Sequence, residues 1–350
     1  MDHDFICGIP PEVWRLIAMC CEDCQTQAQL RATSRALQTN LDTPEVWHTT
    51  RRNVIRKVAL MASCGHIEPI QWMTATFAII PGDVCTKHNN ALHMACAHGQ
   101  LGVAQWLVKE FGLTAENARA DDNYALLTTC KNGHLAVVQW LVKEFGLSRE
   151  DVRADCNYAL RGACINGHLE TARWISNTFE LTGEDARANT NHALRSACEN
   201  GHLGVVQWLI GAFALTRDDA RAEDNCALHG ACANGHLEVA QQLVQKFALT
   251  AEDARANNNG SLRDVCRNGH LLVAQWLVKE FALTAEDARA EDNCALRWAC
   301  TNGHLKVAQW LAQTFALTAE DARARNSMAR NLAHAYGRQE VVKWLNERYG

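Results

Sequence analysis

The sequence has little proline, no long apolar run and no excess of basic residues. Only five of its 350 residues are proline, and no apolar run is long enough to cross a bilayer. Lysine and arginine number 34 against 39 aspartate and glutamate, a formal net charge of −5 with no basic tail or stripe. We therefore expect neither nucleic acid nor a membrane as a partner. Hydrophobic residues make up 48% of the chain, which is ample for a large core and excludes long disordered stretches.

A secretion signal is also missing from the sequence. The first residues, MDHDFICG, carry acid where a secreted protein has a basic region followed by an apolar one. We therefore expect the protein in the cytoplasm or the nucleus. The sixteen cysteines are then expected to be reduced thiols, because these compartments do not favour disulfides.

The dominant feature that is present is a period, with a glycine every 34 residues from Gly65 to Gly337. Seven residues after each glycine stands a tryptophan, with Gln242 as the one departure, and twelve after stands a phenylalanine or, in the last unit, a tyrosine. Nine such units fill residues 53–350. This register predicts modules that cannot bury their apolar faces alone and stack on one another as a solenoid.

Each unit is predicted to be a helix hairpin. In one copy, apolar residues recur at spacings of three and four over residues 135–145, which predicts the second helix. The preceding stretch NYALLTTCKNG offers Asn123 as an N-cap of the first helix and Gly133 as a left-handed C-cap. In the link between hairpins, Thr284 is followed by Glu286 and Asp287, a cap and acidic first turn that predict a brief third helical turn.

The terminal units differ from the others, as the ends of a solenoid must if they are to stay soluble. The degenerate first repeat, residues 53–88, lacks the recurring cysteine and carries Pro69 and Pro81. The capping repeat, residues 325–350, presents a polar exterior where no further unit stacks. The charged residues that it presents there are Arg338, Glu340, Lys343, Glu347 and Arg348.

A period of 34 is also the length of a tetratricopeptide repeat, but the aromatic and proline pattern of that family is missing. The phrase NCALHGACANGHLEVAQQLV at 225–244 instead resembles the ankyrin repeat, in which T-P-L-H-x-A-A leads to G-H-L-E-V-V. The likeness departs where Cys226 and Ala227 replace Thr-Pro and where TAEDARA stands in the finger segment. We therefore expect helical turns or tight loops there in place of β fingers. The predicted fold class is all-α, an α-solenoid of about nine ankyrin-like hairpins.

Residues 1–52 differ from the repeats and predict three helices. The phrases I-P-P-E, L-R-A-T-S-R-A-L and P-E-V-W, the last with Thr43 and Pro44 at a helix start, together resemble an F-box domain. The resemblance implies docking to the cullin-linked adaptor of an SCF-type ubiquitin ligase. The residues that match the docking positions of the family are Ile9, Pro10, Glu12, Val13, Ile17, Leu30 and Leu37. An F-box joined to ankyrin repeats is similar to proteins of large DNA viruses and protists, which implies redirection of host protein degradation.

The repeated phrase CKNGHL raises the question of a zinc site. One thiolate and one imidazole per unit are half of a tetrahedral site, yet packed helices lie roughly 8 to 10 Å apart and two donors on one zinc at most about 5 Å. Disulfides between units fail similarly, because their Cα atoms must lie within about 7 Å. Packing as small hydrophobes is therefore expected for Cys130, Cys164, Cys198, Cys232, Cys266 and Cys300. We expect His134 and its equivalents to hydrogen-bond the turn backbone, and no metal or cofactor.

Two further ladders have a structural and a functional interpretation. The tryptophans are predicted to pack, in preference to forming a platform for stacked bases. Arginines recur at Arg119, Arg153, Arg187, Arg221, Arg255, Arg289 and Arg323. They are predicted to pair with nearby acids such as Asp287 or Glu286, in preference to forming a stripe for phosphate or carboxylate. No nucleophile, paired carboxylate cleft or phosphate-binding loop occurs, so catalysis is not expected.

Recognition is expected where the copies differ, because the repeated positions hold the scaffold. The ankyrin resemblance implies that the varying positions line the concave face and the loop tips used for protein binding. The candidates are Tyr124, Lys131, Tyr158, Arg161, His192, Arg195, Glu199, Arg263, Arg267, Arg297 and Trp298. Trp298 is the one aromatic residue at its repeat position.

Three functional hypotheses follow from the sequence. The first is a monomeric, non-catalytic adaptor that joins a target protein, held by the repeats, to a ubiquitin ligase. The second is a binding scaffold with no ligase link, whose N-terminal helices cap the first repeat. The third, a redox or metal protein, rests on the cysteines alone.

Overall fold

The computed structural model describes residues 44–84 and 91–350, with side chains from Val54 onward apart from Thr76 and Asn326. The described residues form helices and turns without a strand, which confirms the all-α class and the absence of β fingers. The expected docking residues lie outside the described part of the chain. They are Ile9, Pro10, Glu12, Val13, Ile17, Leu30 and Leu37.

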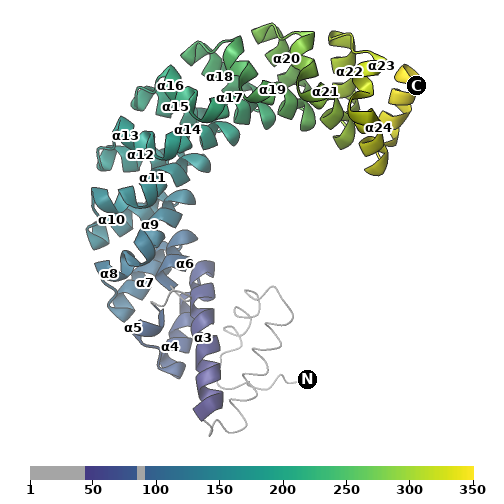
Figure 1. The fold of residues 1–350 in the computed structure, drawn as a ribbon. Helices are drawn as coiled ribbons and strands as arrows, with labels where there is room; N and C mark the ends of the chain where they lie inside the picture. Colours follow the sequence, from purple (N-terminus) through teal and green to yellow (C-terminus); the bar gives the residue numbers. More distant parts are fainter. Residues whose placement is uncertain (1–43, 85–90) are drawn as a thin grey trace. The chain divides into compact units, whose positions relative to one another are not determined.

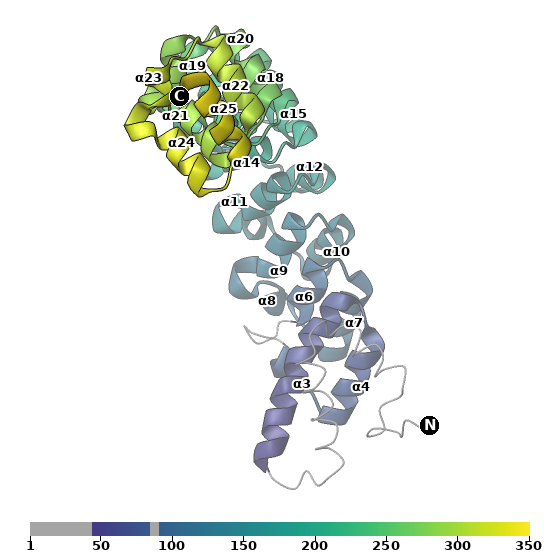
Figure 2. The same cartoon turned by 90° about the vertical axis from the view of Figure 1, so that its right-hand side faces the viewer.

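The chain divides into two units of internal contact. Unit 1 comprises Met1–Ala163 with Glu170–Phe179, and unit 2 comprises Cys164–Leu169 with Glu180–Gly350. Within each unit the hairpins lie side by side, first helix against first helix and second against second (Figure 1). The turned view in Figure 2 shows the last hairpin of unit 2, formed by α24 and α25, beside α21.

Every hairpin contributes one helix to each of two rows. The first helices are α3 (Pro44–Cys64), α6 (Ala91–Ala97), α9 (Ala120–Lys131), α11 (Arg149–Ile165), α14 (Ala188–Glu199), α17 (Ala222–Ala233), α19 (Ala251–Arg267), α21 (Ala285–Asn302) and α24 (Ala324–Ala335). The second helices are α4 (Ile67–Phe77), α7 (Leu101–Phe111), α10 (Leu135–Phe145), α12 (Leu169–Thr178), α15 (Leu203–Ala212), α18 (Leu237–Phe247), α20 (Leu271–Phe281), α22 (Leu305–Thr314) and α25 (Gln339–Tyr349). One-turn helices stand between some hairpins. They are α5 (Pro81–Val84), α8 (Ala115–Ala118), α13 (Gly183–Ala186), α16 (Arg217–Ala220) and α23 (Ala319–Ala322).

The second helix forms as the spacing of apolar residues predicts. In α10, Val138, Leu141 and Phe145 are buried on one stripe. The turn before it closes with Gly133 in the left-handed region, at φ 76. The Gly133 N–H donates to the Cys130 carbonyl and the His134 N–H to the Thr129 carbonyl, the pairing of a Schellman motif. The predicted glycine cap is confirmed.

The predicted third helical turn is also present. Thr284 starts it, with its backbone N–H and hydroxyl donating to the Asp287 carboxylate at 2.7 and 3.1 Å. The backbone N–H of Asp287 points back at the Thr284 side chain, which completes a capping box. In α11, α19 and α21 the stated bounds include both this turn and the first helix of the hairpin, with a kink between them.

A left-handed segment, which the sequence pattern did not predict, lies between the third turn and the first helix. In α9, Asp121, Asp122 and Asn123 have φ of 51, 56 and 64, and the equivalent residues of α11, α14, α17, α19 and α21 do the same. The expectation that Asn123 caps the helix is therefore wrong. Its side-chain oxygen is buried without a hydrogen-bond partner, and its φ is left-handed where an N-cap is normally extended. Asparagine and aspartate tolerate this region better than most residues, which explains their recurrence here.

Helix α3 joins two elements that were expected to be separate. It begins at Pro44, as predicted, but runs unbroken to Cys64, so the expected boundary between residues 52 and 53 lies inside it. Its C-terminal part packs on α4 and α6 as the first helix of the first hairpin. Where the chain is described, no helix combines the length and apolarity that a bilayer span requires.

Candidate target-binding surface

The recurring cysteines are part of the core. Cys96, Cys130, Cys164, Cys198, Cys232, Cys266 and Cys300 are all fully buried. Burial raises the pKa of the Cys232 thiol to about 12, so it remains a neutral thiol at physiological pH. In the described ranges, no group of three or more histidine, cysteine or acidic side chains is placed to hold a metal ion. The burial confirms that these cysteines pack as small hydrophobes.

The recurring histidines tie neighbouring hairpins together. Nε2 of His202 lies 3.0 Å from the carbonyl oxygen of Ile165, in the turn of the preceding hairpin. A Cβ on Gly167 would lie 2.6 Å from the same imidazole, so the ring covers that glycine. The predicted hydrogen bond to a turn is present, but the turn is the neighbour's and not the histidine's own. Glycine is required there both for its positive φ and for the close approach of the ring.

The arginine ladder is also an inter-hairpin structure. Arg289 donates to Asp321 through two bonds of 2.8 and 3.0 Å, and Asp287 accepts in the same way from Arg255. For these arginines the predicted pairing with acids is confirmed, but each aspartate lies 32 residues beyond its arginine and not beside it, and Arg323 in the last hairpin donates to the Tyr349 carbonyl instead. Arg289 holds the pKa of Asp321 at about 2, well below its usual range. The same pairing joins Arg119 to Asp151, Arg187 to Asp219, and Arg221 to Asp253.

The tryptophan ladder packs on the helix that carries it. Trp140 is half-buried and meets Phe145 edge to face, with ring centroids 5.9 Å apart. The equivalent pairs have the same geometry, down to Trp344 and Tyr349 in the last hairpin. Edge-to-face contact is the favoured arrangement of such rings, which confirms the packing role.

Four candidate recognition residues lie in unit 1, on α9 and α11. Tyr124 is 49% exposed, and its ring lies 4.4 Å from that of His93, whose pKa is lowered by burial. On α11 the guanidinium of Arg161 stacks 5.3 Å from the Tyr158 ring. Lys131 lies beside Gly162 of the neighbouring first helix. The structure therefore brings aromatic and basic groups together along these two helices.

In two hairpins of unit 2, the residue five before the turn glycine lies against the residue two before the glycine of the preceding hairpin. Gly230 lies against Glu199, where an added Cβ would be 3.2 Å from the glutamate Cβ. Trp298 occupies the corresponding position on α21 and lies under the guanidinium of Arg267, 4.6 Å from its ring centroid. Arg267 is exposed and is positioned by this cation–π contact.

An ionic cluster adjoins this pair on α17 and α19. Nε2 of His229 lies 2.8 Å from Oδ2 of Asp264, which also accepts from Arg263 at 3.3 Å. Burial would raise the pKa of Asp264, but the bonds from His229 and Arg263 outweigh it, and the pKa is lowered. Sequence reasoning gave Asp264 no role. The sequence signal for Asp264 is a histidine and an acid 35 residues apart. This signal can be recognised only once the register between neighbouring hairpins is known.

Several candidate arginines also support the scaffold. Arg161 and Arg297 are only 6% and 7% exposed, and each donates to two carbonyls of the left-handed segment of its own hairpin. Arg195 makes the same two bonds from a half-buried position. Their guanidinium groups therefore stabilise the left-handed segment, and other candidates form the exposed edge of the first helices. His192 lies on α14 with its ring 3.3 Å from the Ser196 hydroxyl.

The hairpins, the glycine turns and the inter-hairpin ladders define a helical repeat protein. The family model for ankyrin repeats, in three copies, matches residues 92–185, 126–218, 160–258, 194–287 and 228–321. These matches overlap and cover more than half of the chain, and the chain belongs to the ankyrin-repeat family. The comparison with curated proteins found no match. Ankyrin repeats indicate a protein-interaction scaffold, a class that is generally non-catalytic.

Proposed function

We propose that the protein is a monomeric adaptor in the cytoplasm or nucleus that binds a target protein through its first helices. The observation that carries this proposal is the contact between Arg267 and Trp298, the one aromatic residue at its repeat position. Tryptophan and arginine are the residue types most enriched at the energetic centres of interfaces, and here each holds the other in place. The other candidates extend the surface along the same row of helices. In unit 2 they are His192, Glu199 and Arg263, while Arg195 and Arg297 hold the left-handed segment of their own hairpins.

Affinity capture with the full chain tests this surface. We expect a partner retained by the wild type to be lost with Trp298→Ala and with Arg267→Glu. Tyr336→Ala is the matched control, because Tyr336 is a 62% exposed aromatic residue of the last hairpin and no candidate. If every retained partner survives both changes on the first helices, the surface is not the binding site.

We further propose that residues 1–52 dock the cullin-linked adaptor of an SCF-type ubiquitin ligase, so that the bound target is ubiquitylated. The support is the likeness of I-P-P-E, L-R-A-T-S-R-A-L and P-E-V-W to an F-box. Such a protein would suit a virus that redirects degradation in its host. The wild type should co-purify with the purified ligase adaptor, and the double variant Pro10→Ala, Val13→Asp should not. A wild type that fails to bind contradicts the ligase link and leaves the target surface untouched.

A second candidate is an interaction scaffold without any ligase link. It is favoured by the family matches, which all lie in the repeats between residues 92 and 321. In that case target capture would depend on Trp298 as above, while the Pro10→Ala, Val13→Asp variant would behave as the wild type in every assay.

A further inference from the structure

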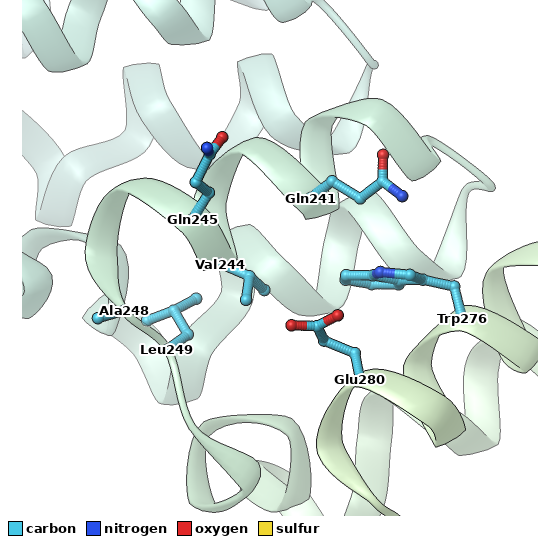
Figure 3. A pocket seen from close by; sticks show the side chains of 7 residues that line it. All are labelled: Gln241, Val244, Gln245, Ala248, Leu249, Trp276 and Glu280. Atoms are coloured by element: carbon cyan, nitrogen blue, oxygen red, sulfur yellow. The ribbon is translucent and has the colours of Figure 1, made fainter.

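A pocket of about 520 Å³ lies between the second helices α18 and α20 of unit 2. Gln241, Val244 and Gln245 line it from α18, and Trp276 and Glu280 line it from α20. Figure 3 shows the Trp276 ring and the Glu280 carboxylate projecting from one helix toward Val244 on the other. The pocket belongs to the row of second helices, so it is separate from the first-helix surface described above.

The lining residues combine an aromatic face with a carboxylate and two amide side chains. Trp276 is half-buried, while Glu280 is exposed and makes no ion pair with another described residue. The face of a tryptophan attracts a cation, a carboxylate pairs with a guanidinium, and amide oxygens accept further N–H bonds. The pocket therefore offers an aromatic face, a carboxylate and amide oxygens to a planar cation that carries several N–H donors.

In the last hairpin, an arginine reaches from the second helix to the neighbouring second helix. Arg348 on α25 stands at the repeat position of Glu280, and Ala312 on α22 stands at that of Val244. Nη2 of Arg348 donates to the Ala312 carbonyl oxygen at 3.4 Å. Its guanidinium carbon also lies 5.3 Å from the centroid of the Tyr349 ring, so the chain's own arginine combines an aromatic contact with a bond to the facing helix. In the copy between α18 and α20 that position carries the opposite charge, which leaves the space open and the electrostatics complementary to an arginine from outside.

A third observation separates this pocket from a similar groove in unit 1. Trp140 and Glu144 on α10 repeat the pair Trp276 and Glu280, but the repeat position of Gln245 is taken on α7 by Lys109. An ammonium there opposes the entry of a second cation. The charge and the space favourable to an arginine therefore occur together between α18 and α20, and not at Glu144.

We propose that the pocket between α18 and α20 binds an arginine side chain of a partner protein. The guanidinium stacks on Trp276, pairs with Glu280 and donates to the amide oxygens of Gln241 and Gln245. Arginine suits the site better than lysine, because its plane matches the indole and its fork of donors matches several acceptors at once.

The test titrates the full chain with the peptide acetyl-Gly-Arg-Gly-amide and follows the indole N–H signal of Trp276, assigned with Trp276→Phe. We expect saturable binding in the millimolar range, as befits one exposed cation–π contact with one ion pair. The same peptide with citrulline, which has the shape of arginine without its charge, should bind at least about fivefold more weakly. Equal binding of the two peptides, or no shift of the Trp276 signal, overturns the proposal.

Matched variants locate the effect. Glu280→Gln should weaken the arginine peptide at least about fivefold, and Glu280→Arg, which copies the last hairpin, should abolish binding. Glu144→Gln is the control and should leave the Trp276 titration unchanged. If Glu280→Gln binds as the wild type does, the carboxylate has no part in the site and the proposal fails. The same peptide with lysine in place of arginine should bind more weakly. Tighter binding of that lysine peptide, or self-association of the chain that Glu280→Arg removes, would assign the pocket to another occupant and overturn the proposal.

Discussion

Within the same hairpins, the residues at the turns repeat from one copy to the next, whereas those on the exposed side of the first helices vary. At the turns, Gly201 with His236 and Gly235 with His270 repeat one contact from hairpin to hairpin. On the first helices, one repeat position holds Gly230 in one hairpin and Trp298 two hairpins later. Uniform positions are those where the neighbouring hairpin dictates the side chain. Varied positions are those where the scaffold tolerates almost any residue and a partner can select one.

The largest expected effect comes from breaking a turn. Gly235 has φ 83, and an added Cβ would lie 2.6 Å from Nδ1 of His270. Gly235→Ala should therefore lower the free energy of unfolding by about 3 kcal/mol, the sum of left-handed strain and the displaced ring. Urea denaturation followed by circular dichroism measures it.

The control for this change is Gly211→Ala, on the exposed side of α15. Gly211 has open space around it, so the substitution should stabilise the helix by about 0.5 to 1 kcal/mol. A similar loss from both substitutions would show that the turn geometry is not the cause.

The next effect separates packing from metal binding at the cysteines. Cys232 is fully buried, so Cys232→Ser transfers a polar hydroxyl from water into the core and should cost about 2 kcal/mol. Cys232→Ala, which keeps the site apolar, should cost about 1 kcal/mol through lost volume. Thermal unfolding with and without a zinc chelator checks both. A chelator that destabilises the wild type but not Cys232→Ala would contradict the packing role.

Features set by the local sequence could be predicted, whereas features that depend on the neighbouring hairpin could not. The helix over 135–145 and the turn at Gly133 were predictable, because period 3.6 and the freedom of glycine are local properties. The left-handed φ of Asn123 and the pairing of Arg289 with Asp321 were not, since both depend on where the neighbouring hairpin lies. An arginine with acids two residues away and 32 residues away looks equally neutral in sequence. The pocket at Glu280 was missed because the tryptophans repeat so regularly that Trp276 looks like every other member of its ladder.

A smaller effect concerns the inter-hairpin ion pairs and their pH dependence. The pKa of Asp321 is held at about 2, below its ordinary value of 3.8, chiefly by hydrogen bonds from Arg289. The ionised carboxylate therefore stabilises the fold above about pH 4, and this contribution is lost as the pH falls toward 2. Asp321→Asn should cost about 1 kcal/mol at neutral pH, since Arg289 is more than one third exposed and screened by solvent.

Its control is the neighbouring exposed acid, Glu320→Gln, which should change little. Unfolding curves from pH 7 to pH 2 should converge for the wild type and Asp321→Asn at the acid end. A constant gap between the two down to pH 2 would show that the charge of Asp321 is not what stabilises the turn.

The smallest expected effect on stability is at Trp298, and its size decides whether the comparison holds. Trp298 is half-buried and its contact is with an exposed arginine, so Trp298→Ala should cost about 0.5 to 1 kcal/mol in the free energy of unfolding. The same repeat position carries Gly230 without disturbing the fold, which shows that the scaffold does not need a large side chain there. A loss as large as that of Gly235→Ala would place Trp298 in the scaffold and remove it from the recognition surface. A small loss of stability, with partner capture abolished, would mean that the fold positions Trp298 but that binding of the partner is what requires it.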